Sequence, residues 1–269
     1  MIRLLLLLTL WLSGCTQPGS DRFFPLGEMT LHRFSGGERN DFEFLGFDTA
    51  AVENDFPLVN GSRLERWSRI NDPDRLAPPD GRLPADLLRW EWYHDFSGGW
   101  DDLLSFYVTQ DDDSGTLTLH AVGVGIDGNR SEAVYWLESP KLLIPPLAQW
   151  QTEISLQAVE LTAYDGRGNR LQQGSLTLTL SPAGLDTAQT PTGRFESLRL
   201  QLALDLSLTL PNGNAYWAYW NGAAWLHPAL GMVRYSLDFS RLVGSEQRLL
   251  QLDRVELISS NMVLPEAAP

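Results

Sequence analysis

Leucine occupies every second position between residues 198 and 210, and the residues between the leucines are mostly polar. In a β-strand, residues i and i+2 share a face, so this spacing places all of these leucines on one side. A helix would distribute the same leucines around its whole circumference. The period therefore predicts a long strand with one buried face and one solvent-exposed face.

A turn and a second strand follow this segment. Residues 211–214 read Pro-Asn-Gly-Asn, which is typical of a tight turn between two paired strands. Residues 215–220 are rich in tyrosine and tryptophan, which favour strands. Together the two segments predict a long β-hairpin.

Several other segments show the same period of two. Residues 176–180, 233–239 and 250–258 are predicted to be strands. In residues 117–126 and 154–163 the apolar positions switch parity partway along the segment. Such a switch predicts a β-bulge, or a strand that crosses between faces of a curved sheet.

The N-terminal third is less regular. Residues 71–84 contain four prolines and are predicted to form a surface loop. A short helix is predicted within residues 64–70 or 84–88. Further strands are expected at residues 29–34, 42–47, 88–92 and 103–108.

These segments predict an all-β fold with a curved antiparallel sheet, in the form of a half-barrel or an open barrel. A two-sheet β-sandwich is the alternative. We expect a single β-rich periplasmic domain at residues 22–263, followed by a tail at residues 264–269.

The chain begins like an exported protein. Arg3 precedes a largely apolar run at residues 4–12, and the small residues Ser13 and Gly14 follow. This is the layout of a secretory signal peptide, and the run is shorter than the ~20 residues that span a bilayer. Residues 1–14 are therefore predicted to be a signal peptide.

Residues 12–15 read Leu-Ser-Gly-Cys and resemble the lipobox of bacterial lipoproteins. The resemblance implies cleavage before Cys15, lipid attachment to its thiol and a lipid membrane as partner. Residues 15–21 would then be the lipidated Cys and its tether. Thr16, where some lipoproteins carry Asp, implies sorting to the outer membrane, facing the periplasm. Cys15 is the only cysteine, so no internal disulfide can form.

The composition excludes one class of partner. The chain has 34 acidic and 20 basic residues, and its formal net charge is −14. Because nucleic acid is a polyanion, it would repel such a protein, and no nucleic-acid partner is expected.

No catalytic residue, metal site or cofactor is predicted. The four histidines (positions 32, 94, 120 and 227) lack metal-ligand spacing, and residues 111–113 lack the alternating spacing of a calcium loop. These three aspartates are interpreted as a solvated turn. No serine lies in a nucleophile elbow.

The aromatic hairpin is the best candidate for a binding site. Such rings can stack on sugars or contact acyl chains, although they can also fill a core. The candidate ligand-binding residues are Tyr216, Trp217, Tyr219, Trp220 and Trp225. On a strand, Trp217 and Tyr219 share one face and Tyr216 and Trp220 the other, and one of these faces is predicted to be open to a ligand.

Residues 23–27 read Phe-Phe-Pro-Leu-Gly. Residues 190–198 read Thr-Pro-Thr-Gly-Arg-Phe-Glu-Ser-Leu, and a Trp-bearing segment at 225–235 ends in Gly-Met-Val-Arg-Tyr. This combination resembles poorly characterised proteobacterial envelope lipoproteins and periplasmic proteins. Ala229 stands where the pattern usually has glycine. The resemblance implies an envelope location and a curved antiparallel β fold, and it implies no activity.

Two functional hypotheses follow. The first is a membrane-anchored periplasmic lipoprotein with a non-enzymatic binding or envelope-assembly role, whose partner is an apolar ligand or an envelope protein. The alternative is an envelope glycan hydrolase or a sugar-binding module. Two carboxylates about 5–10 Å apart in a cleft would favour the hydrolase.

Substitution of Cys15→Ser should abolish lipid attachment, because the thiol is the predicted acceptor. Metabolic labelling with a palmitate analogue would measure this. We expect label in the wild-type protein and none in the variant, and equal labelling of the two would contradict the lipobox interpretation.

Overall fold

The computed structural model describes residues 29–35, 43–44, 63–69, 76–95, 100–111, 113–125, 132–146, 149, 153–191, 193–227, 230–244 and 246–260. The predicted signal peptide, Cys15, the tether, residues 23–27 and the tail lie outside these residues.

The described residues form one antiparallel sheet of thirteen strands. Neighbours in the sheet are mostly neighbours in the chain; β1 pairs with β3, and β2 pairs with the far side of β13. The strands are β1 (Met29–Ser35), β2 (Glu43–Phe44), β3 (Arg63–Arg69), β4 (Leu88–Asp95), β5 (Trp100–Gln110), β6 (Leu117–Gly125), β7 (Glu132–Ile144), β8 (Ile154–Tyr164), β9 (Arg170–Thr190), β10 (Gly193–Thr209), β11 (Ala215–His227), β12 (Gly231–Val243) and β13 (Glu246–Ser260).

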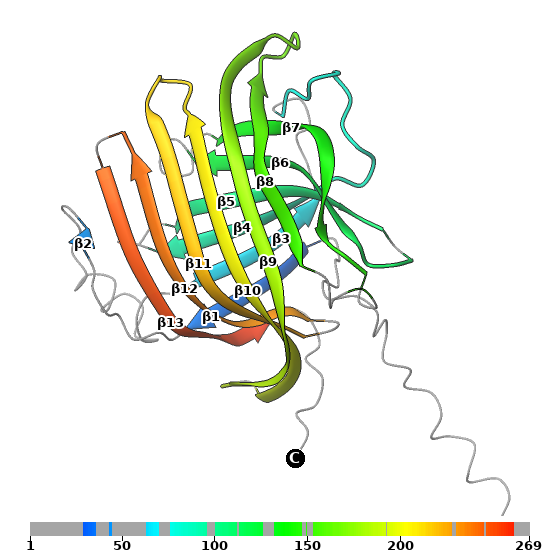
Figure 1. Cartoon of the computed structure of the whole chain (residues 1–269), viewed down its shortest axis with the longest axis vertical. Helices are drawn as coiled ribbons and strands as arrows, with labels where there is room; N and C mark the ends of the chain where they lie inside the picture. Colours follow the sequence, from blue (N-terminus) through cyan, green and yellow to red (C-terminus); the bar gives the residue numbers. More distant parts are fainter. Residues whose placement is uncertain are drawn as a thin grey trace, which may run out of the picture.

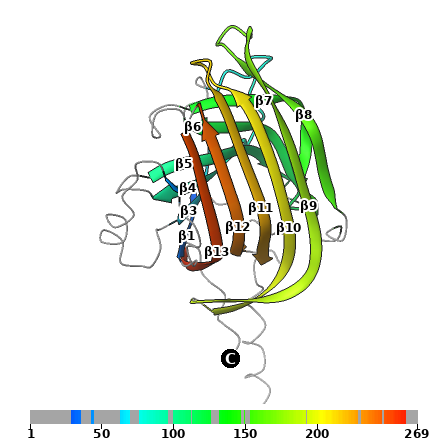
Figure 2. The ribbon, with the colours of Figure 1, turned by 60° about the vertical axis from the view of Figure 1, so that its left-hand side comes forward.

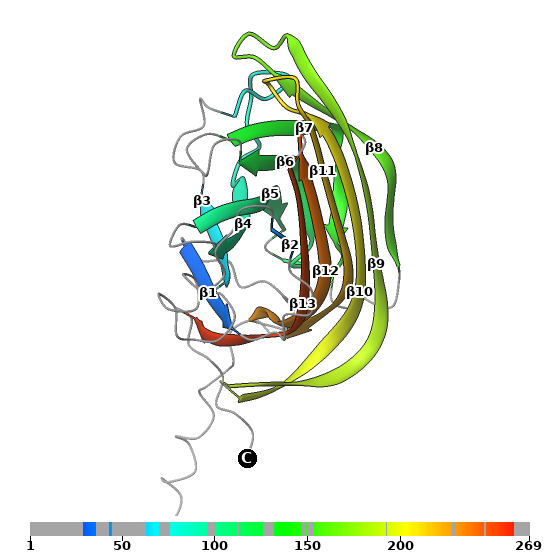
Figure 3. The ribbon, with the colours of Figure 1, turned by 90° about the vertical axis from the view of Figure 1, so that its left-hand side faces the viewer.

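The sheet curls until its two halves face each other. Strands β4–β7 run across the direction of β9–β13 (Figure 1), and after a quarter turn the two groups are seen on opposite sides of the interior (Figure 3). An additional pairing between β1 and β13 joins the two ends of the strand order. The predicted all-β, curved antiparallel architecture of the half-barrel type is confirmed, and the sheet is continuous rather than divided as in a sandwich.

The long hairpin is confirmed. Strands β10 and β11 pair from Leu198 opposite Leu226 to Thr209 opposite Ala215. The turn between them is closed by backbone hydrogen bonds from Gly213 to Leu210 and from Leu210 to Asn214, each 2.8 Å long.

The two parity switches are bulges. Register shifts occur between Leu119 and Ala121 in β6, and between Leu156 and Val159 in β8, where Ala158 adopts a φ of 47°. In β6 the bulge lets Leu117 and Val122, which differ in parity, both join the main core. Such bulges increase the local twist and help a sheet to curl.

The predicted short helix is wrong at both positions. Residues 64–70 fall almost entirely within β3, and residues 84–87 are a turn that leads into β4. Strand β3 pairs on both sides, with β1 and with β4. Pairing on two sides supplies backbone hydrogen bonds that override a modest local helix preference.

Strand β7 shares few residues with its neighbour β8. The registered pairs between these two described strands are Trp136 with Thr162 and Leu137 with Leu161. Beyond Leu137, β7 continues to Ile144 alongside β6, while the first part of β8 pairs with β9. These two strands are therefore paired along only a short part of their described length.

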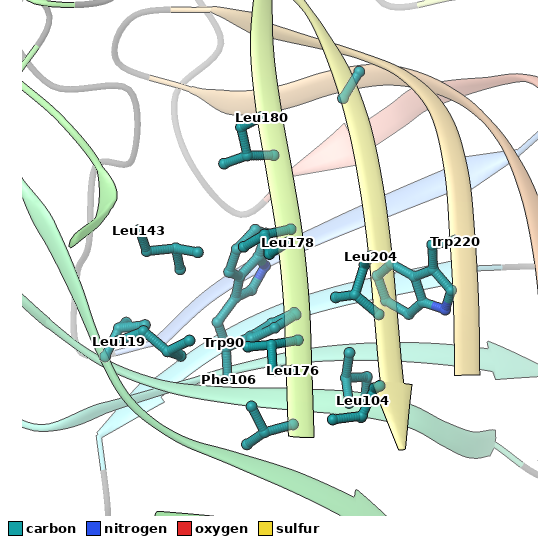
Figure 4. Close-up of a cluster of buried hydrophobic side chains, with 14 of the residues drawn as sticks. Trp90, Leu104, Phe106, Leu119, Leu143, Leu176, Leu178, Leu180, Leu204 and Trp220 are labelled. Atoms are coloured by element: carbon teal, nitrogen blue, oxygen red, sulfur yellow. The ribbon is translucent and has the colours of Figure 1, made fainter. Parts of the chain in front are cut away.

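The main core lies between the two halves. Leu176, Leu178 and Leu180 of β9 point toward Trp90 and Phe106 (Figure 4). The rings of Trp90 and Phe106 have centroids 5.4 Å apart, and Phe106 meets Trp220 edge-on at 6.5 Å.

A smaller apolar cluster consists of Leu76, Leu87, Tyr107, Ala121 and Trp136. Residues 76–87, which contain no strand, contribute two of its leucines. The indole N–H of Trp136 donates to the Leu76 carbonyl at 2.8 Å. The described part of the proline-rich segment is thus a loop, as predicted, and it is packed onto the sheet.

Substitution of Leu204→Asp should destabilise the protein by several kcal/mol, because Leu204 is 1% exposed and an unpaired charge would replace core packing. Its neighbour Asp205 is exposed, so Asp205→Asn should cost less than about 1 kcal/mol. Urea denaturation midpoints of the two variants would measure the difference. Equally mild effects would contradict the assignment of the leucine face to the core.

Candidate functional site

The aromatic side chains of β11 divide between the two faces of the sheet. Tyr216 and Trp220 point inward and are 1% and 2% exposed. Trp217 and Tyr219 lie at alternate positions and are partly exposed. The period of two therefore separates four of the five candidate residues into an inner and an outer pair.

The inner face borders a small apolar cavity. Its lining comes from both halves of the sheet and includes Trp90, Leu143, Leu202 and Trp220. The cavity volume is about 40 Å³. Ligand pockets usually measure ~300–1,000 Å³, and a cavity that holds benzene measures ~150 Å³. Trp220 therefore belongs to a nearly filled core.

The outer face carries an ordered aromatic pair. The rings of Trp217 and Tyr219 are nearly parallel, with an interplanar angle of 7° and centroids 6.0 Å apart. The indole N–H of Trp217 donates to Oδ1 of Asp205 on β10 at 2.9 Å, which orients the ring. The pair is thus held in place on a face whose other side chains are mostly polar.

Trp225 lies farther along the same outer face but is only 6% exposed. The guanidinium carbons of Arg199 and Arg234 lie 5.3 Å and 4.5 Å from its ring centroid. Its indole N–H donates to Oδ2 of Asp186 at 2.8 Å. This hydrogen bond, a second one from the Thr187 backbone and the two arginines lower the pKa of the Asp186 carboxyl.

The five predicted residues are therefore not brought into one concavity. Tyr216 and Trp220 are in the core, and Trp217 and Tyr219 form an exposed pair. Trp225 lies six residues beyond Tyr219, which is about 20 Å along a strand.

A polar cluster on strands β4, β5 and β7 has no counterpart in any sequence motif. Oε2 of Glu132 accepts a hydrogen bond from the Tyr107 hydroxyl at 2.7 Å and forms an ion pair with Nη2 of Arg89 at 2.8 Å. Gly123 makes room for it, because a Cβ at that position would collide with the Glu132 carboxylate. These residues come together only through strand register, so no sequence signal could have found them.

The two histidines whose side chains are described pack against neighbouring side chains. His120 lies 2.9 Å from the Thr109 hydroxyl, and His227 packs edge-on against Phe195. Burial lowers the pKa of both histidines. His32 and His94 lie on β1 and β4 at positions whose side chains are outside the described part.

Asp111 accepts hydrogen bonds from the backbone and the hydroxyl of Ser114, each at 2.7 Å. The predicted turn at this position is confirmed for the residues that the structure describes.

A groove of about 570 Å³ lies between residues 77–83 and residues 165–168. Two carboxylates, Asp80 and Asp165, line it. Asp165 accepts hydrogen bonds from Asn169 and from the Arg167 backbone, and these bonds lower its pKa. A general acid of a glycosidase needs a raised pKa, so Asp165 is unsuited to that role.

The described residues contain no group of three or more His, Cys, Asp or Glu side chains that could hold a metal ion. Within the same residues, no helix has the length and apolar character required to cross a membrane.

No family model matches the chain, and no curated protein matches it. Among solved structures, it is similar to a candidate lipoprotein from Parabacteroides distasonis, with a TM-score of 0.33 and 14% identity over 88% of this chain and 99% of that chain. It is also similar to a candidate exported protein with a YmcC-like fold from Bacteroides fragilis, with a TM-score of 0.34 and 13% identity over 88% and 99% of the two chains. These TM-scores are too low to establish a common fold, so no property of either protein is transferred to this chain.

Substitutions of Trp220→Ala and Trp217→Ala should differ sharply in stability. Loss of the buried Trp220 ring leaves a cavity and should cost about 3–5 kcal/mol. Loss of the half-exposed Trp217 ring removes one hydrogen bond and partial packing, which should cost less than about 2 kcal/mol. Thermal melts of the two variants would measure this. A loss of equal size in both would show that the outer ring is as structural as the inner one.

Proposed function

We propose that this chain is a lipid-anchored, non-enzymatic protein of the bacterial envelope that binds an envelope protein through the outer face of β10–β12. Three observations support the proposal: the targeting signal at the N-terminus, the packing of the interior and the aromatic pair on the outer face.

The proposed location in the envelope is inferred from the N-terminal sequence. Residues 1–14 have the layout of a signal peptide, and Cys15 completes a lipobox. Two or three acyl chains would hold the protein at a membrane without any transmembrane segment, because each buried CH₂ contributes ~0.8 kcal/mol. Attachment to the outer membrane, facing the periplasm, is the finer part of this proposal.

Where the structure describes its lining, the interior has little room for an apolar ligand. The apolar cavity bordered by Trp90 and Trp220 measures about 40 Å³, and a ligand pocket of ordinary size is several times larger. An apolar ligand would have to displace the side chains that now line the cavity. The geometry therefore favours a partner that binds outside the core.

The observation that carries the proposal is the pair formed by Trp217 and Tyr219. Tryptophan and tyrosine are enriched among residues that dominate the energy of protein interfaces, because each supplies a large contact area with few rotatable bonds. Here the two rings are parallel, partly exposed and oriented by Asp205. Such preorganised rings lose little side-chain entropy on binding.

A sugar is the second candidate partner, and a specific observation favours it. The rings stand on a face where exposed polar residues of β10, such as Ser207 and Thr209, alternate with the buried leucines. Aromatic rings that alternate with hydrogen-bonding groups can also stack on a glycan.

The test is co-sedimentation of the protein with an isolated envelope fraction. The Cys15→Ser background is used throughout, so that acyl chains do not hold the protein in the pellet. The double variant Trp217→Ala, Tyr219→Ala should lose binding at least tenfold, which corresponds to about 1.4 kcal/mol. The matched control is Ser207→Ala, Thr209→Ala, which changes the same face without removing a ring and should bind as the parent does.

Digestion of the envelope fraction with protease before mixing separates the two partners. If the partner is a protein, binding should disappear after digestion. Binding that persists after digestion would instead identify a sugar as the partner. If the aromatic double variant and the control sediment alike, the outer face is not the binding surface and the proposal fails.

A further inference from the structure

Three side chains form a row across the outer face of the sheet. Arg199 on β10 is in register with Trp225 on β11, and Trp225 is in register with Arg234 on β12. Arg199 lies near the start of β10, toward the β9–β10 hairpin, whose end curls below the other strands (Figures 2 and 3). The row is separate from the pair formed by Trp217 and Tyr219.

Both arginines approach the same indole ring. Their guanidinium carbons lie 5.3 Å and 4.5 Å from the ring centroid, within the range of cation–π contacts. Arg199 and Arg234 flank Trp225 from the two neighbouring strands, and both pack on its ring. The ring thus fixes the position of two cationic groups on this face.

In the part of the chain that the structure describes, the buried Nε atom of each arginine has no hydrogen-bond partner. Asp186 is near enough for both charges to lower its pKa, but Oδ2 of its carboxylate accepts the indole N–H. A buried donor without an acceptor is unfavourable, so these two Nε–H groups favour the binding of an acceptor.

The charge balance of the chain makes this arrangement notable. The chain has 34 acidic residues and 20 basic ones, so carboxylates are abundant. Glu256 on β13 lies in register opposite Arg234, which places one further acidic position beside the row. Even so, both arginines pack on one tryptophan, and the nearby Asp186 carboxylate accepts a hydrogen bond from its indole N–H.

We propose that Arg199, Trp225 and Arg234 form a binding site for an oxyanion, either a phosphate or a carboxylate group. The planar guanidinium groups match the geometry of such oxygens and form charge-assisted hydrogen bonds with them. Trp225 positions both groups, and Asp186 fixes the ring through its N–H. The site does not depend on the partner proposed for the Trp217 and Tyr219 surface, and either can exist without the other.

The experiment is a titration of the purified full chain in detergent with inorganic phosphate, at constant ionic strength maintained with chloride. A specific site raises the melting temperature with a saturable dependence on ligand concentration. In spectra of the ¹⁵N-labelled chain, the arginine Nε–H signals of Arg199 and Arg234 should shift along the same curve. Acetate tests the carboxylate, and a water-soluble short-chain phosphatidic acid tests a lipid headgroup as the source of the phosphate.

Substitution of Arg199→Gln or Arg234→Gln should weaken phosphate binding at least tenfold, because each removes one charged donor group. Arg170→Gln is the matched control, since Arg170 is an exposed arginine at the start of β9, and it should bind as the wild type does. Arg234→Lys keeps the charge but loses the planar donor group, so it should bind with intermediate strength.

Each outcome decides the proposal. Saturable binding that needs both arginines supports it, and the tightest of the three probes then identifies the source of the anion. The absence of a saturable response in the wild type overturns it. A response that Arg170→Gln reduces as much as Arg199→Gln also overturns it, because that result indicates bulk charge. If a Gln variant fails to fold, the Nε–H signals of the wild type decide alone.

Discussion

The rest of the structure depends on the packing of the leucine face of β9 and β10 against the aromatic rings of β4 and β5 on the opposite half of the sheet. Leu176 and Leu178 lie opposite Leu206 and Leu204 in register, and their side chains pack against rings from β4, β5 and β11. Strands β9 and β10 run across the direction of β4 and β5, so this packing holds the two halves of the curled sheet together. The bulges in β6 and β8 curve the sheet, and the packing stabilises the curved form.

The same period of two sets the chemistry of the outer face. In the first half of β11 the residues that point into the core alternate with residues that face outward, so Trp217 and Tyr219 are partly exposed where Tyr216 and Trp220 are buried. The exposed rings are then oriented by polar groups on adjacent strands. Core formation and surface presentation in this hairpin are consequences of one alternation.

The strands that the sequence predicts are those whose two faces have different environments. Strands β10, β11 and β9 were predictable because one side is leucine or aromatic and the other is polar. Strand β7 was missed because Val134, Tyr135, Trp136 and Leu137 are consecutive. Tyr135 and Leu137 enter the main core, while Trp136 enters the smaller cluster, so both faces are apolar. The Arg89–Glu132 pair and the row at Trp225 depend on the exact register between strands, which a local sequence pattern does not contain.

The short pairing between β7 and β8 leaves part of β7 without β8 as a neighbour, which bears on aggregation. Beyond Leu137, β7 presents a stretch of edge that lacks β8 as a neighbour, and an open edge can pair with a strand of another chain. This stretch contains the exposed residues Glu138 and Pro140, followed by Lys141, the only lysine in the protein. Proline removes a backbone donor, and charged side chains resist stacking of one edge on another. Glu138, Pro140 and Lys141 therefore disfavour pairing of this stretch with another chain, beside the exposed Leu142.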